Sequence, residues 1–158
     1  MAGNNLAEDY YSPEVLSDFR WNNPPRVQTT QSKYMLEEEE ISWKQEIFER
    51  FAYLTILRSG WDSYSAKRIN EDLAQDAFEI LISVANKRTP KPDVIPTKAG
   101  GINIEWHVNN IDLEIEFTSL SDIEVYYDKL NDDEEPIEEL LSADISPLVN
   151  YVNMLTTD

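Results

Sequence analysis

Apolar and polar residues alternate strictly over two neighbouring segments in the second half of the chain, residues 102–108 and 111–117. This period of two predicts two β-strands with one buried face each. Asn109-Asn110 separates them, and Asn tolerates the left-handed backbone of a two-residue hairpin turn. A two-residue loop fixes the register, because a one-residue slip would turn every apolar side chain outward. The predicted apolar pairs are Val108 with Ile111, Trp106 with Leu113, Ile104 with Ile115, and Ile102 with Phe117.

The segments flanking this hairpin are predicted from the same pattern. A third strand over residues 123–127 follows a turn at residues 119–121. Residues 91–99 contain Pro92 and Pro96 and are interpreted as an extended linker. Short helices are predicted near Pro136 to Leu141 and Pro147 to Leu155, each with Pro in its first turn, and Ser146 is expected to cap the last one.

Helical periodicity dominates the first half of the chain beyond residue 40. Apolar residues between Ile47 and Thr55 repeat at helical spacing, which predicts a helix from about residue 38 to residue 59. The acidic run at residues 37–40 would lie at its start, where carboxylates favour the positive end of the helix dipole. Gly60 is expected to end this helix as a left-handed cap.

A second helix is predicted over residues 71–84. Asn70 is placed to cap its N-terminus, and one apolar stripe runs from Leu73 to Val84. Lys87 and Arg88 are expected at its negative end, and Pro90 prevents its continuation.

These elements predict an α+β fold. Two helices would pack on an antiparallel β-meander of three to four strands, followed by short C-terminal helices. Residues 41–158 would form a single α+β domain with an acidic C-terminal region, and residues 1–40 a partly ordered N-terminal arm. The arm contains five aromatic residues. Three interpretations stay open for it: it packs over the domain, it binds a partner or exchanges within a homodimer, or it is disordered.

Charge is concentrated at one end of the chain. The 158 residues carry a net charge of −18, and residues 100–158 hold 15 Asp and Glu against a single Lys, Lys129. Such a region repels nucleic acid and anionic membranes and attracts basic protein surfaces. The chain has no Cys, which suits a reducing compartment. It also lacks a signal-peptide pattern and any apolar run of about 20 residues, so we expect a cytoplasmic protein.

The hairpin register also defines what lies on the polar side of the sheet. Glu105 would lie opposite Glu114, and His107 opposite Asp112. Three interpretations compete for these carboxylates: a solvated face that confers solubility, a docking face for a basic protein, and a divalent metal site. The calcium-loop spacing is missing, so no metal or cofactor is predicted. The predicted partner-binding carboxylates are Glu105, Asp112, Glu114, Glu116, Glu124, Asp132, Asp133, Glu134 and Glu135, with Glu138 and Glu139 extending the face.

Catalytic chemistry has little support in the sequence. His107 is the only histidine, and its pairing with Asp112 favours a cross-strand ion pair over acid–base work. No Gly-flanked nucleophile and no Gly-rich phosphate loop are present, so we expect a protein that is not an enzyme. A small hydrolase using Asp62, His107 and Asp112 is the weakest alternative.

The loop after the first helix contains two aromatic residues. Trp61 either packs between the helices or, together with Tyr64, anchors a partner, because Trp and Tyr dominate binding hot spots. Asp62 is expected to bond backbone groups within the turn. We include Trp61 and Tyr64 among the candidate partner-binding residues.

Three stretches of this region resemble a family of small uncharacterised bacterial and phage-borne proteins. These are the Gly-Trp-Asp-x-Tyr-x-Ala loop at residues 60–66, the Pro-Thr-x-x-Gly-Gly turn leading into a Glu-Trp strand at residues 96–106, and the strand at residues 113–117. The resemblance covers roughly residues 58–128 and carries no established activity. It implies an origin among mobile genes, where antitoxins, immunity proteins and phage inhibitors of host defence are common.

The sequence therefore predicts a non-catalytic acidic protein that binds and inhibits a basic protein acting on nucleic acid. Its carboxylates would mimic the phosphates of nucleic acid, as an anti-CRISPR-like or antitoxin-like inhibitor does. Direct binding to nucleic acid or to a membrane is not expected. The alternative is a structural or assembly protein that oligomerises through its aromatic N-terminal arm.

Overall fold

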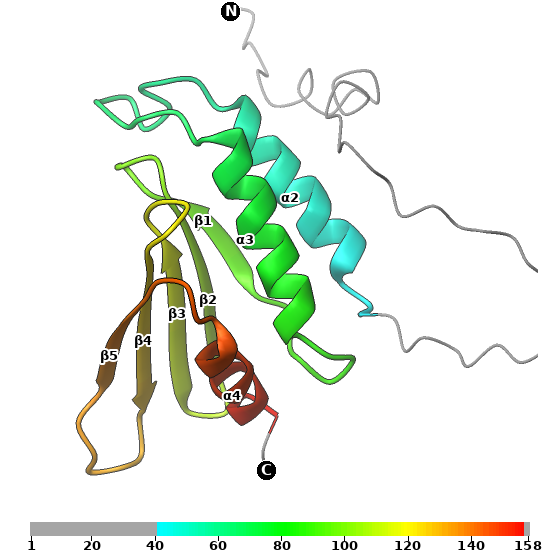
Figure 1. Cartoon of the computed structure of the whole chain (residues 1–158), viewed down its shortest axis with the longest axis vertical. Coiled ribbons are helices and arrows are strands. Elements are labelled where there is room, and N and C mark those ends of the chain that lie inside the picture. The colour runs from blue at the N-terminus through cyan, green and yellow to red at the C-terminus, as the bar shows by residue number, and fades with distance from the viewer. Residues whose placement is uncertain (1–40, 157–158) are drawn as a thin grey trace, which may run out of the picture. The chain divides into compact units, whose positions relative to one another are not determined.

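The computed structural model describes residues 41–156, which form three helices and five strands (Figure 1). In chain order the elements are α2 (Lys44–Ile56), α3 (Glu71–Val84), β1 (Asp93–Pro96), β2 (Ile102–Val108), β3 (Ile111–Phe117), β4 (Ile123–Lys129), β5 (Ile137–Leu141) and α4 (Ser146–Met154). The predicted arm, residues 1–40, and the predicted acidic helix start at residues 37–40 lie outside the described residues.

The five strands form one antiparallel meander in the order β1-β2-β3-β4-β5. The predicted α+β class is confirmed, with five strands in place of the expected three to four. Each strand pairs with its neighbour in sequence, because every connection is short enough to make a hairpin. Alternate residues of all five strands therefore line two continuous faces.

The predicted hairpin register is confirmed at every position. Val108 pairs with Ile111 and Ile102 with Phe117, with all five intervening pairs as expected. Asn109 and Asn110 both adopt positive φ angles, 52° and 57°, as the two-residue turn requires. The Asn109 side chain also donates a 2.9 Å hydrogen bond to the carbonyl of Leu155, which ties the turn to the end of α4.

The helices cover one face of the sheet, and the core lies between the two layers (Figure 1). Phe51 of α2 and Phe78 of α3 meet edge to face with ring centroids 5.5 Å apart. Trp106 is 1% exposed, and its indole N–H donates to the carbonyl of Pro90 at 2.8 Å. Burying this large ring while satisfying its one polar atom removes the usual penalty for a buried Trp.

Two segments fold differently from the prediction. Part of the expected linker, Asp93–Pro96, is strand β1 and pairs with β2. The expected helix near Pro136 is strand β5, which pairs with β4 from Tyr127–Ile137 to Ile123–Leu141. Both segments are short and lie beside Pro, so the pattern of apolar and polar residues within them does not distinguish a strand from other structures. The ladder offered by the neighbouring strand decides their conformation.

Several helix ends also need correction. Helix α2 begins at Lys44, and residues 41–43, within the range predicted as helical, are not helical. It ends at Ile56, three residues before the predicted end, so Gly60, with φ +77°, turns the following loop instead of capping the helix. Extended backbone at Leu57 stops α2.

The cap predicted for α3 is confirmed, because the Asn70 side chain accepts bonds from the N–H groups of Asp72 and Leu73. Lys87 and Arg88 lie beyond the last turn, which contains no basic residue. Ser146 does not cap α4. It is the first helical residue, and Asp144 accepts its backbone N–H at 2.9 Å.

Candidate interaction face

The face of the sheet opposite the helices carries the predicted acidic residues. The strand registers align its side chains in rows that cross the sheet. One row runs Asp93, Glu105, Glu114, Tyr126, Glu138, and the next runs Ile95, Asn103, Glu116, Glu124, Leu140. A shorter row holds His107, Asp112 and Asp128. We call the eight carboxylates of these rows the acidic face: Asp93, Glu105, Asp112, Glu114, Glu116, Glu124, Asp128 and Glu138.

Like charges lie directly opposite each other on this face. Glu105 pairs with Glu114, Glu116 with Glu124, and Asp112 with Asp128. Such cross-strand pairs destabilise a sheet. Within residues 41–156, His107 is the sole basic side chain that the register places on these rows. The acidic face therefore has a much higher net negative charge than a face on which Lys residues alternate with the carboxylates.

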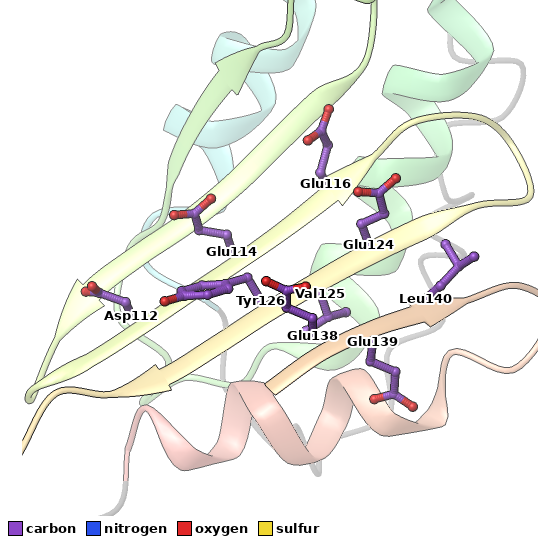
Figure 2. A pocket seen from close by; sticks show the side chains of 9 residues that line it. All are labelled: Asp112, Glu114, Glu116, Glu124, Val125, Tyr126, Glu138, Glu139 and Leu140. Carbon is purple, nitrogen blue, oxygen red and sulfur yellow. The ribbon is translucent and has the colours of Figure 1, made fainter. Parts of the chain in front are cut away.

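A hollow of about 720 Å³ lies on the β3–β5 side of this face. Figure 2 shows the side chains of Glu114, Glu116, Glu124, Tyr126 and Glu138 on the same side of the sheet around it. Leu140, which is 63% exposed, and Val125 also line the hollow. The hollow thus combines carboxylates with one aromatic and two aliphatic residues.

Two other ionisable groups on this face, Tyr126 and His107, have raised pKa values. The pKa of Tyr126 is raised, first by burial and then by the charges of Asp128 and Asp112. The pKa of His107 is also raised, chiefly by its 2.9 Å hydrogen bond from Nδ1 to Asp112, with a smaller contribution from Glu105 at 3.7 Å. The expected His107–Asp112 ion pair is present.

Asn103 connects two of the carboxylates. Its amide N–H₂ donates to Glu105 at 3.2 Å and to Glu114 at 3.4 Å. The amide oxygen of Asn103 is buried without a hydrogen-bond partner. The reverse orientation of the amide would direct this oxygen at two negative charges, so the local field selects the observed one.

The β1 edge of the face is less purely acidic. Lys91 bonds Glu46 of α2 at 2.7 Å, and its ammonium also interacts with Asp93. Arg50 of α2 donates from Nε to the carbonyl of Val94 at 2.9 Å. Two basic side chains, Arg50 of α2 and Lys91 of the segment before β1, therefore border the acidic face at β1.

The loop between β4 and β5 holds the other four predicted partner-binding carboxylates. Asp132, Asp133, Glu134 and Glu135 are all exposed, and Asp132 pairs with Lys129 at 3.3 Å. Glu139 does not extend the face. Its register partner is the core residue Val125, and its carboxylate accepts a 2.9 Å hydrogen bond from Tyr151 of α4, on the opposite side of the sheet (Figure 2).

Sequence reasoning missed two members of the acidic face, Asp93 and Asp128. Asp93 was missed because β1 was not recognised as a strand, whereas Glu138 was expected to extend the face although β5 was predicted to be a helix. Asp128 was within reach, because it continues the alternation of Glu124 and Tyr126 along β4. Extending the predicted third strand to Asp128 would have placed this residue opposite Asp112, as the structure does.

Trp61 and Tyr64 lie apart from the acidic face, in the loop between α2 and α3. The indole of Trp61 donates to the carbonyl of Lys67 at 3.2 Å, and Tyr64 is 86% exposed. As expected, Asp62 accepts the backbone N–H groups of Tyr64 and Ala66, at 2.9 and 3.1 Å. These bonds also lower the pKa of Asp62, because they stabilise its ionised carboxylate. Asp62 therefore stabilises the conformation of the loop.

The loop and turn that carry the family resemblance meet in space. The N–H of Lys67 bonds the carbonyl of Lys98 at 3.0 Å, and Gly100, with φ +93°, lies so close to Arg68 that a Cβ would approach its carbonyl oxygen to 3.0 Å. Gly100 therefore allows the close approach between the loop and the turn, while Trp61 and Asp62 form hydrogen bonds within the loop itself.

Comparison with known proteins adds no assignment: no family model, no curated protein and no solved structure matches this chain. The resemblance over residues 58–128 stays a prediction. None of the helices in the described part of the chain is long and apolar enough to cross a membrane. Within the same residues, no group of three or more His, Asp or Glu is arranged to hold a metal ion.

Proposed function

We propose that this protein is a non-catalytic inhibitor that docks a basic, nucleic-acid-acting protein on its acidic face. In this proposal it works in the cytoplasm, and its carboxylates occupy the partner's phosphate-binding surface. Anti-CRISPR-like and antitoxin-like inhibitors are the classes that fit best. The observation that carries the proposal is the set of like-charge pairs on the acidic face.

Those pairs argue against a face kept acidic for solubility alone. A solubility surface gains from charges of mixed sign, whereas opposed carboxylates cost stability. Glu116 faces Glu124 directly, and no Lys or Arg of residues 41–156 lies within ion-pairing distance of either. Selection for binding a cationic partner explains why this arrangement is kept.

The geometry of a sheet suits phosphate mimicry. Neighbouring strands lie about 4.8 Å apart and same-face residues along one strand roughly 6.7 Å apart. The acidic face is thus a dense two-dimensional array of negative charge on a rigid support. Its field would steer a basic partner into contact and orient it.

The proposal is tested by capture and inhibition. The tagged full-length chain would be used to capture proteins from host lysate at low salt, and each captured protein would be purified and identified. We expect a basic protein whose binding falls steeply as salt rises, since exposed charges are screened within about 10 Å at 0.1 M ionic strength. Adding the chain should also inhibit the partner's activity on nucleic acid.

A matched pair of variants makes this test specific. Glu114→Lys/Glu116→Lys reverses two charges on the acidic face, while Asp76→Lys/Glu79→Lys makes the same change on the exposed side of α3. The first variant should lose the partner and the second should keep it. Equal binding by both variants would refute the acidic-face proposal. Self-association lost on deleting residues 1–40, with no partner captured, would favour the assembly alternative.

A further inference from the structure

The two edges of the sheet are protected to different degrees. Strand β1 at one edge ends with Pro96 and follows Pro92, and α2 donates to its backbone through Arg50. Pro and side-chain hydrogen bonds are common ways of blocking an edge strand. A further strand is therefore disfavoured at β1.

Strand β5 at the other edge also follows a proline, Pro136, but it lacks the other two devices. Between Ile137 and Leu141 there is no Pro, Lys or Arg, and within residues 41–156 its backbone bonds only the β4 ladder. Alternate N–H and C=O groups of an edge strand face away from its neighbour. Ile137 and Leu140 are 46% and 63% exposed. This edge therefore offers both backbone partners and apolar side chains.

We propose that β5 receives an extended basic segment of the partner protein as a sixth strand. This inference rests on the proposed function and names how the partner is held. Backbone hydrogen bonds would supply affinity, and side-chain neighbours on the two faces would supply selectivity. An added strand would be flanked by Glu138 and Leu140 on the outer face and by Ile137 and Glu139 on the inner one.

Charge selects the chemistry of that strand. Both faces of β5 carry a carboxylate, and the loop leading into it holds four more at residues 132–135. Alternating basic and apolar residues match this edge best. A second copy of the chain fits poorly, because antiparallel pairing of two β5 strands would gather the carboxylates of both copies between proteins of net charge −18.

The probe for this inference is a labelled, end-capped seven-residue peptide of alternating Lys and Val, titrated against the full-length chain by fluorescence anisotropy. Its control is the same peptide N-methylated at every residue, which keeps charge and side chains but removes the backbone donors. We expect the unmodified peptide to bind about tenfold or more tightly than the control, as the loss of a few backbone hydrogen bonds requires. Amide exchange in β5 should slow with the unmodified peptide alone.

Two variants of matched charge complete the test. Leu140→Lys places a positive charge beside the edge, and Leu120→Lys makes the same change at a 59% exposed site in the loop between β3 and β4. Leu140→Lys should abolish the preference for the unmodified peptide, and Leu120→Lys should preserve it. Equal binding of the two peptides, or binding of neither, would overturn strand addition at β5. The acidic-face proposal would then still be decided by the partner's response to Glu114→Lys/Glu116→Lys.

Discussion

The two faces of this sheet are built from the same strands under opposite rules. On the inner face every cross-strand pair of β2 and β3 is apolar, and Ile104, Leu113 and Ile115 are at most 2% exposed. On the outer face Glu105 of β2 lies opposite Glu114 of β3, and β3 and β4 place Glu116 opposite Glu124 and Asp112 opposite Asp128. The apolar pairs of the inner face stabilise the folded state, whereas the like-charge pairs of the outer face destabilise it. The difference indicates that the outer face is maintained for something other than stability.

The largest effect should come from the inner face. Replacing Trp106 by Ala removes a buried ring and its hydrogen bond to Pro90. We expect a loss of about 3–5 kcal/mol in the free energy of unfolding, which is typical of Trp-to-Ala changes in a core. Urea denaturation followed by circular dichroism measures it. A loss below about 1 kcal/mol would mean that this face is not the main source of stability.

A smaller effect of opposite sign is expected on the outer face. Glu116→Lys converts the repulsive pair with Glu124 into an attractive one. The free energy of unfolding should rise by roughly 0.2–1 kcal/mol at low ionic strength, and added salt should shrink the gain. The same denaturation experiment provides the test, with Glu79→Lys on α3 as the control for net charge. If Glu116→Lys lowered the free energy of unfolding, the claim that the outer face opposes folding would be wrong.

The smallest effect concerns His107, whose imidazole is half exposed. Its raised pKa means that the protonated ring stabilises the folded state below its unfolded pKa, and this contribution is lost as pH rises through the folded pKa. His107→Gln should therefore be destabilising at about pH 5.5 and nearly neutral at about pH 9. Thermal unfolding at the two pH values measures the difference. A larger loss at the higher pH would contradict the ion pair with Asp112.

How far the sequence predicts each face depends on how local its signals are. Strict alternation and the Asn109-Asn110 turn determine the β2–β3 register residue by residue, so both faces of that hairpin follow from the sequence. Strand β5 lacks alternation: its Ile-Glu-Glu-Leu-Leu run after Pro136 also suits an amphipathic helix. Only pairing with β4 makes it a strand, and this non-local interaction placed Glu138 on the acidic face and Glu139 against α4.

Charge counts alone also cannot say which acidic residues share a surface. The sequence predicted the excess of carboxylates after residue 100, but two of the face residues come from segments misassigned as linker and helix. Residues 60–66 show the converse. Trp61, Asp62 and Gly60 stand out in the sequence, yet their hydrogen bonds lie within the loop itself.

The central claim is that the acidic face is a recognition surface whose repulsion is retained for binding. The most direct test is the dissociation constant of the purified partner for the wild-type chain, for Glu114→Lys/Glu116→Lys and for Asp76→Lys/Glu79→Lys. We predict that reversal on the face weakens binding about a hundredfold or more while the fold stays intact, and that reversal on α3 changes it less than about threefold. Equal dissociation constants for the two variants would contradict the claim.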